Sequence, residues 1–92
     1  MEEKKLTHDF CAKFKAEITD NSGSKLRAAI LCLLDSKSAT APLKKMYLKR
    51  ECQKRKNFLV KFTEACETLR HAASTPERKL QIVALRQEIS GQ

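Results

Sequence analysis

Glycine and proline are scarce in this chain, with two residues of each among 92. All-β proteins need such residues for their many turns, so the scarcity argues against that class. The sequence is instead rich in Lys, Glu, Leu, Ala and Arg, which favour helices. We therefore expect an all-α fold, a small bundle of four to five short helices that forms one domain over residues 1–92.

Long apolar runs are also missing. No stretch of 18 apolar residues occurs and no signal-peptide core follows Met1, so we expect a soluble intracellular protein. The basic helix lacks a Trp/Phe/Leu-rich face free to insert, so we also expect no membrane binding. The four cysteines form no CxxC pair, and neither histidine lies at ligand spacing from them. We therefore predict reduced, structural thiols and no metal or other cofactor.

Catalytic motifs are absent as well. The chain has no Gly-rich phosphate loop, no HExxH and no G-x-S-x-G. His8 and Asp9 are neighbours on a predicted helix, so their side chains point about 100° apart and cannot act as a pair. We predict that the protein is not an enzyme.

Positive charge, by contrast, is concentrated in one segment. Residues 44–61 hold eight Lys or Arg and one acid, a formal charge of +7 out of the net +8. Charge confined to one segment produces a local field and indicates a negatively charged partner.

Apolar periodicity and capping signals divide the chain into helices. The first is expected at Glu3–Thr19 and the second at Lys25–Asp35. The first carries a stripe of four apolar residues: Leu6, Phe10, Phe14 and Ile18.

The third helix is expected to start after Thr40, with Pro42 in its first turn, and to end near Lys54. Helical geometry places Leu43, Met46 and Tyr47 on one side, which we predict to face the core. Lys45 and Lys49 then lie on an outer basic stripe.

A fourth helix is expected at Phe58–Ala73, with Asn57 as its cap or as a kink. Its apolar stripe is the clearest in the chain: Phe58, Phe62, Ala65, Cys66, Leu69 and Ala73. Leu59 and Val60 fall off that stripe, which makes them ordinary core residues or the wall of a hydrophobic groove.

The last helix is expected to have Thr75 as N-cap and Pro76 at its first position, and to end at Ser90 before Gly91. It carries apolar residues on two sides: Leu80, Val83 and Ala84 on one, Ile82, Leu85 and Ile89 on the other. One side can pack on the bundle. The other has to meet another element, a partner or a second copy of the chain.

Parts of the sequence resemble the TAFH domain, or nervy homology region one, of ETO-type corepressors and a TFIID subunit. The resemblance covers residues 6–72 and rests on Gly23, the Lys/Arg–hydrophobic run 25–36, and the elements 48–51 and 58–62. Lys61 stands where the family has proline, and Thr63 where it usually has leucine. The resemblance implies a four-helix domain of a nuclear transcription regulator that binds short amphipathic peptides in a hydrophobic groove.

Two functions follow from the basic segment and the surplus apolar residues. The first is a protein-interaction module for acidic amphipathic helices. The alternative is a helical protein that binds the backbone of double-stranded RNA or DNA, as a monomer or as a homodimer through the C-terminal helix. The predicted groove residues are Phe14, Leu48, Leu59 and Val60. The basic residues predicted to bind either a peptide or phosphates are Lys45, Lys49, Arg50, Lys54, Arg55 and Lys56.

Overall fold

The computed structural model describes residues 12–18, 23–35 and 39–91. Residues 12–18 are helical, and four complete helices follow: α2 (Ser24–Asp35), α3 (Ala41–Lys54), α4 (Lys56–Ala72) and α5 (Pro76–Ser90). These described ranges contain no strand, so the predicted all-α bundle is confirmed. The first predicted helix is helical over its described part, and its residues Leu6 and Phe10 lie outside that part.

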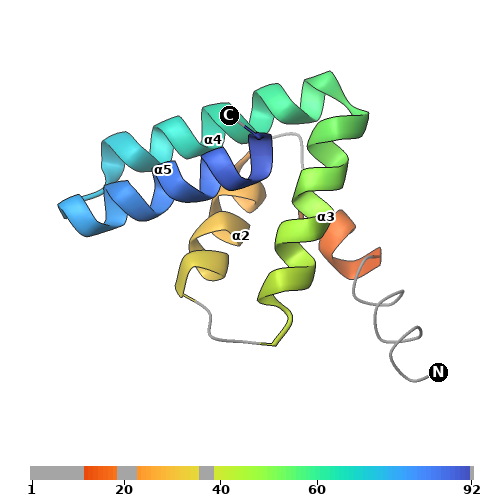
Figure 1. Ribbon diagram of the computed structural model, residues 1–92, viewed down its shortest axis with the longest axis horizontal. Helices are drawn as coiled ribbons and strands as arrows, with labels where there is room; N and C mark the ends of the chain where they lie inside the picture. The colour runs from red at the N-terminus through yellow and green to blue at the C-terminus, as the bar shows by residue number, and fades with distance from the viewer. Residues whose placement is uncertain (1–11, 19–22, 36–38, 92) are drawn as a thin grey trace.

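Helices α4 and α5 run side by side and make the most extensive helix–helix contact (Figure 1). The predicted end signals of α5 are confirmed. The Oγ1 atom of Thr75 accepts a hydrogen bond from the Arg78 backbone N–H at 3.2 Å, and Pro76 opens the first turn. Gly91 follows the last turn in the left-handed region, with φ of 78°, which a residue with a side chain rarely adopts. Both ends of α5 are therefore fixed locally.

The core lies between α4 and the other helices. The stripe of α4 is buried as predicted, apart from Ala73, which is partly buried and packs against the core. The same core contains three buried residues each from α2 and α5, and two from the first helical segment: Leu26, Ile30, Leu33, Ile82, Leu85, Ile89, Phe14 and Ile18. Leu80, on the outer side of α5, is 70% exposed. Ala84 on the same side is also exposed and Val83 is half-buried, so this apolar side of α5 lies largely in solvent.

The chain turns sharply between α3 and α4 (Figure 1), and the turn is at Arg55 rather than at the predicted Asn57. Arg55 has extended backbone angles of −131° and 115°. Its N–H bonds to the Glu51 carbonyl at 3.0 Å, and its own carbonyl accepts from the Leu59 N–H at 3.1 Å. One residue therefore ends α3 and starts α4, so that α4 begins two residues earlier than predicted.

The predicted inward side of α3 is wrong in part. Met46 is 48% exposed, whereas Leu43 and Tyr47 are half-buried, and Tyr47 packs against the core. The buried residues of α3 are Leu48, Glu51 and Cys52. The helix contacts both α4 and α5, and burial between these two neighbours selects the Leu48 side over the Met46 side.

Candidate interaction groove between α3 and α5

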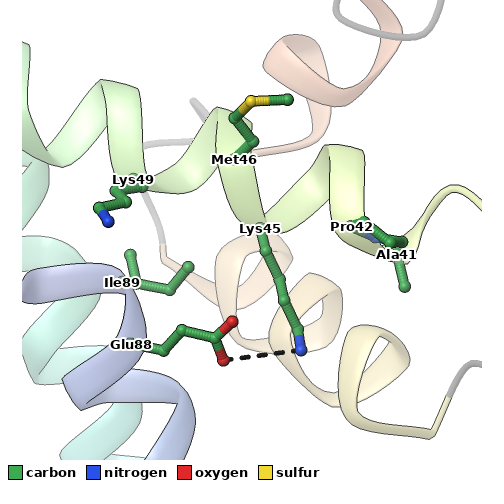
Figure 2. Close-up of a pocket in the computed structure, with 7 residues that line it drawn as sticks. All are labelled: Ala41, Pro42, Lys45, Met46, Lys49, Glu88 and Ile89. Atoms are coloured by element: carbon green, nitrogen blue, oxygen red, sulfur yellow. Dashed lines mark ion pairs between the residues drawn. The ribbon is translucent and has the colours of Figure 1, made fainter.

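Two predicted basic residues, Lys45 and Lys49, lie one helical turn apart and face α5. They line a hollow of about 480 Å³ together with Ala41, Pro42, Met46, Glu88 and Ile89. Figure 2 shows Lys45 reaching across to Glu88, while Lys49 lies beside Ile89. The hollow thus has an apolar wall and a charged rim.

The end of α5 determines which residues reach this hollow. Gly91 ends the helix directly after Ser90, so Glu88 and Ile89 occupy its last turn. Ile89 is buried and anchors that turn in the core. Glu88 is exposed at the surface beside it and faces α3.

An ion pair crosses the hollow. The Lys45 Nζ and Glu88 Oε2 atoms lie 3.6 Å apart, and the two side chains are 40% and 57% exposed. At this exposure an ion pair contributes only about 0–1 kcal/mol, because water and salt screen it. Lys49 forms no ion pair with any acid of the described ranges, so the hollow holds two cations and one anion.

A second hollow of about 300 Å³ adjoins the first and shares Ala41, Lys45 and Glu88 with it. Its other lining residues come from the end of α2 and the middle of α5: Leu33, Leu34, Gln81, Ala84 and Leu85. We call the two hollows together the α3–α5 groove. The Lys45–Glu88 pair lies where they meet.

The four predicted groove residues do not come together in one groove. Phe14 and Leu48 are 2% and 1% exposed and belong to the core. Leu59 and Val60 line a separate hollow of about 420 Å³ between α4 and α5. Its remaining lining residues are Thr63, Arg86, Gln87 and Ser90.

The remaining predicted basic residues lie around the α3–α4 corner. Arg50, Lys54 and Lys56 are exposed and make no ion pair with an acid in the described part of the chain. Arg55 differs, because its Nε lies 3.4 Å from the Oε2 of the buried Glu51. Of the positive charges predicted at this junction, that of Arg55 is therefore partly neutralised by Glu51, whereas those of Arg50, Lys54 and Lys56 are not.

Two cysteines of the described ranges, Cys52 and Cys66, are buried and carry free thiols. Burial is the main cause that raises the pKa of Cys66 to about 12, and the guanidinium of Arg86 partly opposes it. Burial, together with the carboxylate of Glu51, raises the pKa of Cys52 to about 11. Both thiols are therefore protonated at neutral pH, and a thiolate is the form that reacts.

Comparisons of the chain with protein-family models, curated proteins and solved structures find no match. Within the described ranges, no helix is both long enough and apolar enough to cross a lipid bilayer.

The sequence pattern includes Lys45 and Lys49 among six predicted basic residues, but it does not predict that these two face α5 or which apolar and acidic residues lie beside them. It predicts that Pro42 starts the helix and that Met46 faces the core, and it makes no prediction for Glu88. It correctly places Ile89 on one apolar side of the last helix. The contact between Lys45 and Glu88 spans 43 positions of the chain, and no local pattern signals it.

Proposed function

We propose that this protein is an interaction module that binds an acidic amphipathic helix in the α3–α5 groove. The observation that supports the proposal most strongly is the composition of the groove. Apolar Pro42, Met46 and Ile89 lie beside Lys45 and Lys49, with a single acid, Glu88, to neutralise them. One positive charge beside apolar surface matches a helix that carries both an acid and bulky apolar side chains.

In the proposed complex, the partner helix lays its apolar side along the groove, with one side chain in each hollow. Met46 is exposed and unbranched, so it can adapt its shape to the partner. A carboxylate of the partner pairs with Lys49, whose charge is not matched by a described acid. Covering Lys49 with the partner lowers the local dielectric constant and strengthens this pair.

The resemblance to the TAFH domain gives the proposal a biological setting. It implies that the partner is a peptide of a transcription regulator and that the protein works in the nucleus. We propose both on the resemblance alone.

The test is a titration with a labelled helical peptide that carries one Glu between two Leu residues. We expect Lys49→Gln to weaken binding about fivefold, since an ion pair of about 1 kcal/mol is removed. Lys79→Gln removes the same charge from the other end of α5, where the residue is exposed, and should change binding less than twofold. Equal losses of affinity in both variants would mean that the peptide responds only to net charge.

The second candidate function is binding to a nucleic acid duplex. The exposed cations Arg50, Lys54 and Lys56 favour it, because phosphates require accessible charge and no particular groove. A homodimer through α5, where Leu80 is exposed, would double this surface.

The two functions respond to different variants. Replacing Arg50, Lys54 and Lys56 together by Gln should reduce duplex binding and flatten its salt dependence, in proportion to the number of phosphates that these side chains neutralise. The same triple variant should leave binding of the acidic peptide within about twofold of the wild type. Sub-micromolar duplex binding that collapses with salt, without any peptide binding, would favour the second function. A sedimentation measurement on the wild type and on Leu80→Lys reports whether α5 forms a dimer.

A further inference from the structure

The two lysines of the groove differ in one respect. Lys45 and Lys49 are four residues apart on α3 and line the same hollow. Lys45 already has a carboxylate at 3.6 Å, that of Glu88, whereas Lys49 has no ion pair with a described acid. The groove therefore offers two cations of which one is already matched.

A partner helix with two acids four residues apart would match the spacing of the two lysines, because both pairs of residues repeat once per helical turn. In this structure, its second acid would approach a place that the Glu88 carboxylate already occupies. Two carboxylates beside one ammonium group repel each other, and like charges brought together in a partly desolvated site are disfavoured.

Glu88 also lies where its charge has the greatest effect on a bound helix. It lines both hollows of the groove, and its ion pair with Lys45 lies at their junction (Figure 2). A helix that fills both hollows has to pass over this pair. The pair is more than a third exposed on both sides, so it responds readily to a change of partner.

We infer that Glu88 determines partner specificity by acting as an internal competitor for Lys45, so that a second acid on the bound helix brings no gain in affinity. The inference rests on the proposed function, since it concerns the same groove. Removing the charge of Glu88 frees Lys45 for a second carboxylate of the partner. Removing this charge therefore changes which of two partner helices binds more tightly, as well as how tightly each one binds.

The experiment compares two helical peptides with identical leucines, one with a single Glu and one with a second Glu four residues away in place of Gln. For the wild type, we expect the second Glu to change affinity less than twofold. For Glu88→Gln, we expect the second Glu to improve affinity about three- to tenfold, the gain of one additional ion pair that the bound helix covers.

The matched control is Glu64→Gln, which gives the same net charge from an exposed position on α4 outside the groove. The ratio of its affinities for the two peptides should equal the ratio for the wild type. Equal ratios in Glu88→Gln and Glu64→Gln, with both peptides still bound, would overturn the inference while leaving the proposed function intact. If neither peptide bound any of the three folded proteins, both would fail together. Thermal melts of the variants establish that each protein is folded.

Discussion

Helices α3 and α4 are consecutive, of similar length and both basic at the corner they share, yet they use their side chains differently. Every stripe residue of α4 from Phe58 to Leu69 is buried. In α3, the acid Glu51 is buried and the apolar Met46 is exposed. The buried side of α4 is therefore entirely apolar, whereas that of α3 includes a charged residue.

α4 therefore contributes mainly surface that stabilises the fold, whereas α3 also contributes surface that a partner can contact. α4 packs its apolar stripe against α2, α3 and α5, and Val60, which lies off the stripe, is 52% exposed. α3 leaves the Met46 side open beside Lys45 and Lys49, and the end of α5 forms the opposite wall. An exposed apolar side chain between cations suits recognition better than stability.

The largest expected effect comes from the centre of α4. Phe62 is fully buried, so Phe62→Ala should lower the free energy of unfolding by about 3–5 kcal/mol through reduced burial and a residual cavity. Val60→Ala, on the exposed side of the same helix, should cost less than about 1 kcal/mol. Chemical denaturation of both variants makes the comparison, and equal losses of stability would contradict the packing described for α4.

A second effect depends on alkaline pH. Burial raises the pKa of Cys66 to about 12 and that of Cys52 to about 11, from an ordinary value of 9.0. Above pH 9 the unfolded chain loses these protons before the folded protein does, so stability present below pH 9 should fall as pH rises toward 11. Denaturation at pH 8 and pH 10 should show a smaller decline for Cys66→Ala than for the wild type. An identical decline would mean that other groups cause it.

A smaller effect is expected at the start of α5. Thr75→Ala removes the side-chain acceptor of the Arg78 N–H and should cost about 1 kcal/mol. Thr75→Ser keeps the hydroxyl and should retain most of the stability. Urea denaturation distinguishes the two, and a destabilisation by serine as large as that by alanine would exclude a capping role.

The smallest effect on stability is expected at the exposed turn of α3. Met46→Ala should change the free energy of unfolding by less than about 0.5 kcal/mol, since half of the side chain is already in water. The same change should weaken binding of the acidic peptide severalfold by removing apolar contact area. A large decrease in stability would instead assign Met46 to the core, as its position in the sequence pattern predicts.

The contrast between α3 and α4 also explains what the sequence could predict. The stripe of α4 is unambiguous, and the end signals of α5 are local, so their predicted positions are correct to within two residues. α3 has two competing apolar sides, one with Met46 and one with Leu48, and only contact with α4 and α5 decides between them. For the same reason, the charge pattern marks Lys45 and Lys49 only as two of several basic residues, and the pairing of Lys45 with Glu88 depends on how α5 lies against α3.

Backbone chemical shifts during titration with the single-Glu peptide test the central proposal most directly. The proposal predicts the largest changes at residues 41–49 of α3 and at Glu88 and Ile89, with little change at Lys54 and Lys56. The largest changes at the α3–α4 corner, or no changes at a peptide concentration of about 1 mM, where even weak complexes form, would contradict it.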